Sequence, residues 1–485
     1  MAHEFCAATT GNPMSDELNF LSATELAARI RGKQVSAVEV MQAHLAQIER
    51  VNPKVNAMVT LQAEEALKQA CAADAKQAKG ELLGPLHGLP VAHKDLFLTK
   101  GLRTTRGSLI FKDFVPDTSH LLVERTWNAG AIAVGKTNTP EFGAGSQTFN
   151  AVFGATRNPY DLTKTCGGSS GGAAVVLATG MVPLADGSDL GASLRNPANF
   201  CNVVGLRPSV GRVPSYPTKH LWGNLSVAGP MARTVQDTAL LLSVQAGFDH
   251  RVPIAIAGTG DHFRAPLERS FKGTRVAFAP GFGGQVPVDK QVETIVAAHG
   301  KTLTDLGCIV EEAIPDFSGA HEVFLTLRAH LFEINNGEYL DKHRDLLKAT
   351  VIWNIEAGRK QSGVDIARAD AERSKILDRV SKFFETYDYL VCPVNQVLPF
   401  SIDKEYVDEI NGEKLGDYLS WMKSCYYITI TGHPAISVPC GFTPEGLPVG
   451  IQIVGKSFAD LEVLQLAHAF EQATQFARRR PAVVK

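Results

Sequence analysis

From about residue 84 onward, short apolar runs alternate with Gly-rich loops and helical segments. Residues 89–93, residues 131–134 and the apolar text from Val176 each have the length of a strand. Strand-length runs between helical segments are typical of α/β proteins, so we expect an α/β fold with a mixed β-sheet core flanked by helices. Further strand-like runs are predicted at residues 275–279, 389–393, 435–439 and 449–454.

Helix signals precede and follow this alternation. Ser22 with Glu25, and Ser36 with Glu39, have capping-box spacing and predict two N-terminal helices. Gly32 is expected to end the first helix, and Pro53 is expected to end the second. Other helices are predicted at residues 62–79, 288–306 and 458–475.

No internal repeat or low-complexity linker divides the chain, so residues 1–485 are expected to form a single domain. Within it we distinguish N-terminal helices at 20–80 and a core at 84–245. A charged segment at about 316–386, poor in Gly and Pro, is predicted to be a helical insert. The C-terminal strands and helix then occupy residues 387–480.

Charge and hydropathy exclude several classes of protein. Lys and Arg number 48 and Asp and Glu number 50, so the chain lacks the basic character of a dedicated nucleic-acid binder. Its longest apolar stretch, residues 173–185, is interrupted by Gly180 and Pro183 and is shorter than the ~18 residues needed to cross a bilayer. No secretory signal is visible, so we expect a soluble, cytoplasmic protein that binds neither membrane nor nucleic acid.

The eight cysteines contain no C-x-x-C pair, so the sequence predicts neither a metal site nor a disulfide framework. Cys166 and Cys201 lie near the motifs discussed below, but we expect them to be small buried residues rather than nucleophiles.

Two motifs in the chain are misleading. Residues 130–137 match the phosphate-binding pattern G-x-x-x-x-G-K-[ST], but the intervening Ala-Ile-Ala-Val favours a strand rather than a phosphate loop. Residues 167–171 match G-x-S-x-G, and so does the frame around Ser170. That pattern needs a later histidine, and the best candidate, His433, lies in a predicted loop. We therefore expect neither nucleotide binding nor a Ser-His-Asp triad.

A more informative arrangement spans residues 167–208. The Gly- and Ser-rich loop at 167–172 leads into an Ala- and Val-rich helix, and Ser193 follows a turn of small residues, with Asp189 before it and Arg195 after it. Upstream, Lys94 ends an apolar strand. Two serines and a lysine suffice for nucleophilic catalysis without histidine when burial lowers the pKa of the lysine toward working pH.

These segments closely resemble the amidase signature family, which is built on a Ser-cis-Ser-Lys triad. The resemblance covers roughly residues 20–480 and is weakest at 316–420; it extends to segments at 135–142, 155–159, 200–208, 229–235, 431–439 and 446–452. It implies a hydrolase that cleaves an amide C–N bond through an acyl-enzyme, with a small-molecule amide and water as substrates. It also implies that no metal or organic cofactor is needed, and it suggests a homodimer.

By position in the motifs, the resemblance assigns Ser193 as the nucleophile, Ser169 as the bridging serine after a cis peptide bond, and Lys94 as the base. The oxyanion would be held by the backbone amides of Leu190, Gly191, Ala192 and Ser193. Supporting roles fall to Ser170 and Ser188 beside the lysine and to an Asp189–Arg195 pair. One departure is Ala192, where the family usually has glycine, so a methyl group is expected near the substrate carbonyl.

Aromatic side chains in the loops and in the helical insert are expected to shape the substrate pocket, and they favour neutral, aryl or apolar amides, with esters and carbamates left open. The set comprises Phe142, Phe149, Trp222, Trp353, Trp421 and Tyr426, together with Phe324 and Leu327. An alternative is the A subunit of a glutamyl-tRNA(Gln) amidotransferase, which has the same signature and works only in a complex. A third possibility is a non-catalytic binding protein with this fold.

Overall fold

The computed structural model describes residues 17–485, and its centre is a mixed sheet of eleven strands in the order β1-β3-β2-β6-β8-β7-β14-β15-β11-β9-β10. The strands of this sheet are β1 (Met58–Leu61), β2 (Pro90–Lys94), β3 (Ile132–Thr137), β6 (Leu184–Asp189), β7 (Val204–Arg207), β8 (Val227–Ala232), β9 (Arg275–Phe278), β10 (Ile309–Glu312), β11 (Tyr389–Pro393), β14 (Ala435–Phe442) and β15 (Pro448–Gly455). Two short hairpins lie outside it, β4 (Phe149–Asn150) with β5 (Gly154–Ala155) and β12 (Glu409–Ile410) with β13 (Glu413–Lys414).

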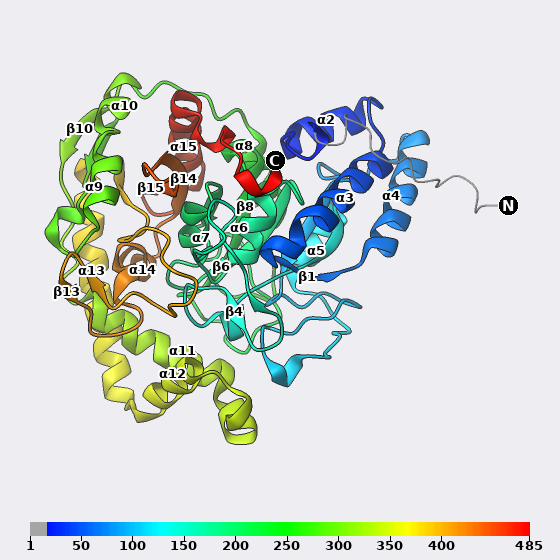
Figure 1. Cartoon of the computed structure of the whole chain (residues 1–485). Helices are drawn as coiled ribbons and strands as arrows, with labels where there is room; N and C mark the ends of the chain where they lie inside the picture. Colours follow the sequence, from blue (N-terminus) through cyan, green and yellow to red (C-terminus); the bar gives the residue numbers. More distant parts are fainter. Residues whose placement is uncertain (1–16) are drawn as a thin grey trace.

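Helices flank the sheet along its whole width, which confirms the predicted fold class. They are α2 (Ala23–Arg31), α3 (Ala37–Val55), α4 (Ala63–Ala78), α5 (Leu121–Asn128), α6 (Gly171–Ala178), α7 (Arg195–Phe200), α8 (Val235–Gln245), α9 (Lys290–Ala297), α10 (Gly300–Asp305), α11 (Ala320–His343), α12 (Ala349–Lys360), α13 (Gly363–Thr386), α14 (Lys423–Thr431) and α15 (Asp460–Thr474). The N-terminal helices α2 to α4 lie at the β1 side of the molecule, and α9 and α10 lie at the β10 side (Figure 1).

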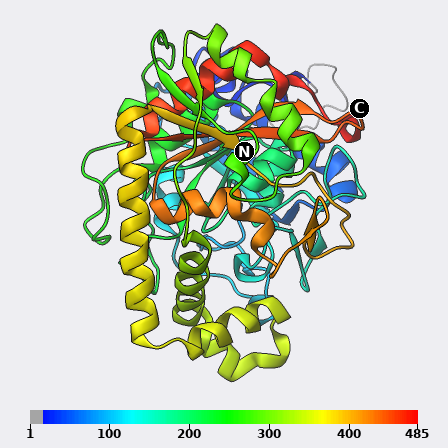
Figure 2. The same ribbon diagram turned by 90° about the vertical axis from the view of Figure 1, so that its left-hand side faces the viewer.

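The predicted helical insert is present as α11, α12 and α13. In Figure 2 the long α13 runs beside α11, while α12 folds back at the lower end of the molecule. Buried Phe332, Leu340, Val351 and Ile355 join α11 to α12, and Phe142 of the core packs against them. The insert is therefore attached to the core through an apolar cluster of its own.

The capping boxes predicted at Ser22 and Ser36 are both formed, and Gly32 caps the end of α2. The prediction that α3 ends before Pro53 is wrong, because the helix continues to Val55. A proline in the last turn removes only one backbone hydrogen bond. The helix ends instead at Asn56, which has left-handed backbone geometry, while the Asn52 side chain accepts hydrogen bonds from the next two amides.

Two other local predictions need correction. Residues 288–306 form two helices, α9 and α10, rather than one. The break falls where His299 bonds to the Cys440 carbonyl, next to a glycine of low helix propensity. The apolar residues from Val176, predicted as a strand, form the end of α6, and the strand begins only at Leu184. Helix and strand are hard to separate in short apolar runs.

The sheet brings the chemistry-bearing segments to one edge. Strands β2 and β6 are parallel neighbours, with Ala92 paired to Ala185, so Lys94 at the end of β2 and Asp189 at the end of β6 emerge on the same side. Helix α6, which follows the Gly- and Ser-rich loop, packs on both strands. The segment that imitates a phosphate loop is strand β3, and its Lys136 is buried and donates to Thr99.

Two features are absent from residues 17–485. No helix there is long and apolar enough to cross a membrane. Within the same residues, no group of three or more His, Cys, Asp or Glu side chains is placed to hold a metal ion.

Candidate active site

Lys94 is fully buried, and its amine lies at the centre of three hydroxyl groups. Its Nζ is 2.7 Å from Ser169 Oγ, 2.9 Å from Ser170 Oγ and 3.0 Å from Ser188 Oγ. Its backbone amide donates to Asp186, which fixes the end of β2. The structure therefore brings together the lysine and three of the serines singled out in the sequence.

Burial lowers the pKa of Lys94 to about 7, against the opposing effect of Asp189 and Asp186, which favour the charged amine. A neutral amine has two N–H donors and one lone pair. The Ser170 hydroxyl lies 3.4 Å from the Ser188 carbonyl, to which it can donate, so it accepts from Nζ. If Ser188 also accepts, the lone pair of the neutral amine faces Ser169.

The Ser169 segment is held in place by close contacts to glycines. The Gly168–Ser169 peptide bond is cis, as the resemblance implied. Gly143 has φ of +72°, and a Cβ there would lie 3.3 Å from Ser169 Oγ. A Cβ at Gly187 would lie only 2.5 Å from Ser170 Oγ. Glycine is thus needed at these positions for the serines to approach Lys94.

Ser193 follows β6 and begins the turn into α7. Its carbonyl accepts from Ser170 N–H, which ties the nucleophile candidate to the Gly- and Ser-rich loop. The carbonyl of Gly191 accepts from Arg195 and from Thr429. Because the peptide group is planar and trans, the N–H of Ala192 points away from that pair. In the described residues, no hydrogen bond occupies the amides of Gly191, Ala192 and Ser193.

Ala192 is accommodated without backbone strain, since it is not among the described residues with positive φ. Its side chain is almost completely buried and also lines the cavity described below. The turn therefore accommodates the methyl group of Ala192 without distortion.

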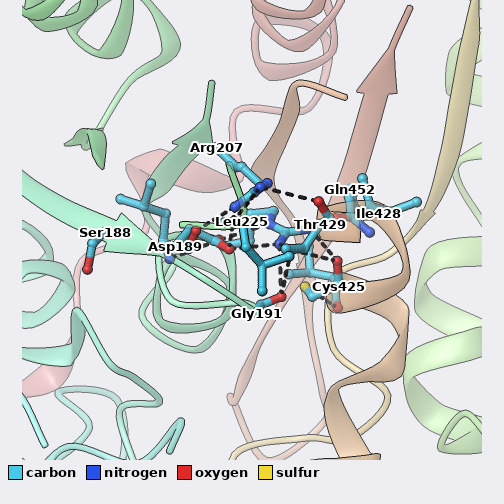
Figure 3. A network of polar contacts seen from close by, with 12 residues as sticks. Ser188, Asp189, Gly191, Arg207, Leu225, Cys425, Ile428, Thr429 and Gln452 are labelled. Carbon is cyan, nitrogen blue, oxygen red and sulfur yellow. Dashed lines mark hydrogen bonds and ion pairs between the residues drawn. The ribbon is translucent and has the colours of Figure 1, made fainter. Parts of the chain in front are cut away.

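A buried ion-pair network around Asp189 supports this turn (Figure 3). Arg195 donates from Nε and Nη2 to the two carboxylate oxygens of Asp189, at 3.0 and 2.9 Å, so the predicted pair is present. Arg207 adds a second guanidinium at 3.3 Å from Asp189. Burial alone would raise the pKa of Asp189, but the two guanidinium groups and their hydrogen bonds hold it at about 2.

The network also crosses between distant parts of the chain. Arg195 Nη1 donates to Gln452 of β15 and to the Cys425 carbonyl of α14, and Nη2 donates to Thr429. Arg207, Thr429 and Gln452 were missed by the sequence analysis, although Arg207 and Gln452 both lie in segments of family resemblance. No sequence pattern distinguishes these three buried residues from ordinary loop or strand residues.

A cavity of about 600 Å³ opens beside Ser169 and Ser193. Leu190, Gly191 and Ala192 form part of its lining, and α11 forms another part. Cavity residues on this helix recur at three- and four-residue spacing: Phe324, Arg328, Leu331, Phe332, Asn335, Asn336 and Tyr339. That periodicity is a signal in the sequence from which the wall could have been identified.

Of the six aromatic residues predicted to line the pocket, Phe142 does so. The prediction is wrong for the other five, which do not line this cavity. Trp222 is 71% exposed on a loop, and Trp353 is on the outer surface of α12. Trp421 is buried against Phe400, Phe149 carries the Lys348 ammonium over its ring, and Tyr426 lies behind Phe324 in a stacked pair. Of the two further candidates, Phe324 lines the cavity and Leu327 does not.

The other candidate nucleophiles and bases lie elsewhere. His433 is buried between Thr431 and Ser457, with its ring against Phe384. Burial raises the pKa of the Cys166 thiol to about 12 and that of the Cys201 thiol well above its usual value, which keeps both protonated.

The chain is similar to known proteins over most of its length. The model of the family described as Amidase matches residues 39–464. An acylamidase of Rhodococcus erythropolis is 34% identical, with 96% of this chain and 98% of that protein aligned. The A subunit of the glutamyl-tRNA(Gln) amidotransferase of Moorella thermoacetica is 36% identical, with coverage of 96% and 99%.

Among solved structures, a bacterial aryl acylamidase of the amidase signature enzymes superposes with a TM-score of 0.89 at 30% identity, over 95% of this chain and 98% of that one. A 6-aminohexanoate cyclic dimer hydrolase, solved with its substrate, superposes with a TM-score of 0.88 at 25% identity, over 96% and 100% of the two chains.

Proposed function

The chain belongs to the amidase signature family, whose hydrolases act on amide C–N bonds, and we propose that it is a free-standing amidase that forms an acyl-enzyme on Ser193. The observation that carries the proposal is the buried Lys94 amine among three serine hydroxyls, with its pKa lowered to about 7, beside a cavity that Ser169 and Ser193 line.

In the proposed acylation, neutral Lys94 accepts the proton of Ser169 while Ser169 accepts that of Ser193. Ser193 Oγ then attacks the amide carbonyl carbon and forms a tetrahedral oxyanion. The unoccupied amides of Gly191, Ala192 and Ser193, with that of Leu190, supply donors to this oxygen. The C–N bond breaks as Ser169 gives a proton to the leaving nitrogen and recovers one from Lys94, which leaves Lys94 neutral for the next step.

Deacylation uses the same residues in the same order. Water loses a proton to Ser169, which again passes one to Lys94, and the hydroxyl attacks the Ser193 ester. Collapse of the second tetrahedral intermediate returns a proton to Ser193 Oγ and releases the carboxylic acid. Every proton is carried by residues of this chain.

The cavity supports an amide with an aryl or apolar body. Phe142, Phe324, Phe332, Leu331 and Tyr339 give it an apolar side, large enough for a ring. The aryl acylamidase among the structural neighbours is consistent with this substrate class. Aryl esters and carbamates share the tetrahedral chemistry and belong to the same proposal.

The test is product release from primary amides, anilides and carbamates by the purified chain and by Ser193→Ala. Hydrolysis that is lost in the variant, with its thermal stability unchanged, supports the proposal. Hydrolysis that survives the substitution would show that Ser193 is not the nucleophile. Ser374→Ala, on the exposed surface of α13, serves as a matched control.

The A subunit of a glutamyl-tRNA(Gln) amidotransferase is a second candidate, because one such protein is 36% identical to this chain. That role predicts that the isolated chain releases no ammonia from glutamine or any other amide until partner proteins are added. Ammonia release by the purified chain alone would exclude it.

A further inference from the structure

We propose that Arg328, assisted by Arg106, forms a subsite for a carboxylate group carried by the amide substrate. The inference rests on the proposed amidase function and specifies the substrate class. It comes from two guanidinium groups that line the Ser193 cavity without a carboxylate partner.

Arg328 is held in a defined place by its neighbours. It projects from α11 and is only 3% exposed. Its Nη1 donates to the side-chain oxygen of Asn354 on α12, and Asn354 in turn donates to the Tyr418 hydroxyl at 2.6 Å. The guanidinium lies over the ring of Phe332 at 4.3 Å and that of Tyr418 at 5.6 Å. A long side chain held by two helices and two rings is preorganised.

The charge of Arg328 is not neutralised. A guanidinium has five N–H donors, and in the described residues only one hydrogen bond uses them, to a neutral amide. Neither Arg328 nor Arg106 forms an ion pair with any carboxylate of residues 17–485. Aromatic rings cover the faces of the Arg328 guanidinium, but they cannot accept from its in-plane N–H groups as a carboxylate does.

Burying an unpaired charge is costly, so such a group is expected to find its counter-charge elsewhere. Arg106 also lacks a carboxylate partner. Its Nε is buried without a hydrogen-bond partner, and its guanidinium lies over Phe111 at 4.8 Å. It also has positive φ, at +54°, an uncommon conformation for a residue with a Cβ.

The cavity has no negative charge of its own. Its lining includes Arg106, Lys219 and Arg328 but no Asp or Glu among the described residues. Lys219 differs from the two arginines because it already forms an ion pair with Glu338. It also donates a hydrogen bond to the backbone carbonyl of Asn335. The uncompensated charge is thus confined to Arg106 and Arg328.

A carboxylate is the group that best matches this arrangement. The guanidinium presents parallel N–H donors that fit the two oxygens of a carboxylate. The nearby amide side chains of Asn335 and Asn336 offer further donors. A substrate with a carboxylate at one end and the scissile amide at the other would use both the charged wall and Ser193.

The first test compares 4-nitroanilides of malonic, succinic and glutaric acid with anilides in which an isopropyl group replaces the free carboxylate. A second pair places the carboxylate on the leaving group, as butyryl-4-aminobenzoate against butyryl-4-toluidide. We expect at least one acid to exceed its neutral counterpart in kcat/KM by about tenfold. Neutral counterparts that are hydrolysed equally well or better in both series would overturn the inference.

Arg328→Met should remove that preference, mainly through a higher KM for the acids, so that acids and neutral anilides are hydrolysed with similar kcat/KM. Lys219→Met is the matched control and should retain the preference, because its charge is already paired. Loss of activity on acid and neutral substrates alike would mean that Arg328 only supports the helix. Should Arg328→Met fail to fold, Arg328→Lys and Arg106→Met test the same subsite and should lower kcat/KM of the acids relative to that of their neutral counterparts.

A binding measurement separates this inference from the proposed function. Titration of Ser193→Ala with succinate and glutarate by calorimetry needs no turnover. Binding that is lost on adding Arg328→Met supports the subsite even if no amide is hydrolysed. Absence of dicarboxylate binding, together with normal turnover of neutral anilides, would overturn the subsite and leave the amidase proposal intact.

Discussion

At the scale of single residues, the site depends on one buried amine. Desolvation makes the charged form of Lys94 costly, and three hydroxyls provide the contacts that a neutral amine needs. The same residue in water would be protonated at neutral pH and unable to accept a proton from Ser169. Burial is therefore what turns this lysine into a base.

The first prediction concerns pH. Because the reactive form of Lys94 is neutral and its pKa is about 7, kcat/KM should rise with pH and level off above about 8. The measurement is the pH profile from about 5 to about 9.5 with a neutral anilide, checked for stability at each pH. A profile that still rises at about pH 9.5 would show that the pKa of Lys94 is not lowered in the free enzyme.

The second prediction concerns Asp189. Asp189→Asn leaves two buried guanidinium groups without their common counter-charge, so it should lower the free energy of unfolding by about 3–5 kcal/mol and abolish turnover. Urea denaturation measures the loss. The matched control is Asp305→Asn, whose exposed pair with Lys301 should contribute less than about 1 kcal/mol. Equal stability losses in both variants would contradict the role of the network.

At this scale, the residues that meet at Lys94 and the Asp189–Arg195 pair could be predicted from the sequence. The sequence does not reveal Arg207, Thr429, Gln452 or Arg328, whose importance arises only when distant segments come together. The aromatic residues were poorly predicted for the same reason. Whether Trp353 faces a cavity or solvent depends on how α12 rotates against α11, which its sequence does not determine.

At the scale of elements, the substrate wall depends on close packing between α11 and α12. Gly358 of α12 faces the Ala329 carbonyl of α11, and a Cβ at that position would lie 2.4 Å from the oxygen. A backbone carbonyl cannot move aside as a flexible side chain can. The glycine therefore sets the distance between the two helices that position Arg328 and Asn354.

The third prediction follows from that contact. Gly358→Ala should separate the helices, lower the free energy of unfolding by about 1–3 kcal/mol and weaken substrate binding. Gly363→Ala, at the start of α13, is the control: a Cβ there would meet nothing within 4 Å, so it should be neutral or stabilising by up to about 1 kcal/mol. Thermal unfolding and KM distinguish the two. A stable Gly358→Ala with unchanged KM would contradict the packing argument.

Elements with a clear local signal were predictable. The backbone hydrogen bonds of such elements are made within the element or with its neighbour. Examples are the capping boxes of α2 and α3 and the strand-like runs of β2, β3 and β15. The helix end at Pro53 was wrong because a proline in the last turn removes only one backbone hydrogen bond. The break at His299 was missed because a contact made outside the helix determines it. The Cys440 carbonyl that holds His299 is 141 residues away in the sequence.

At the scale of the whole molecule, two halves of the chain share one sheet. Strands β1 to β8 of the sheet come from the first half, and β9 to β15 come from the second. They join where β7 pairs with β14, at Arg207–Ala435, Leu206–Ile436 and Gly205–Ser437. This short antiparallel seam lies beside the Asp189 network, which also links both halves.

The fourth prediction tests the expectation of a single domain. A fragment of residues 1–269, cut in an exposed loop, contains Lys94, Ser169 and Ser193 but lacks Gln452 and Thr429. It should show no cooperative unfolding and no labelling by a serine-directed fluorophosphonate. Co-expression with residues 270–485 should restore both signals. A fragment that folds and is labelled alone would show two independent domains.

The seam also bears on synthesis by the ribosome. Lys94, Ser169 and Ser193 are made early, whereas Gln452, which accepts from Arg195, is made near the end. Until β14 and β15 leave the ribosomal tunnel, Arg195 and Arg207 lack their partners from the second half, and the turn that carries Ser193 lacks part of its support. Newly made chains should therefore stay inert toward cellular amides until translation is almost complete, and a chain truncated before residue 452 should be no hazard as a stray hydrolase.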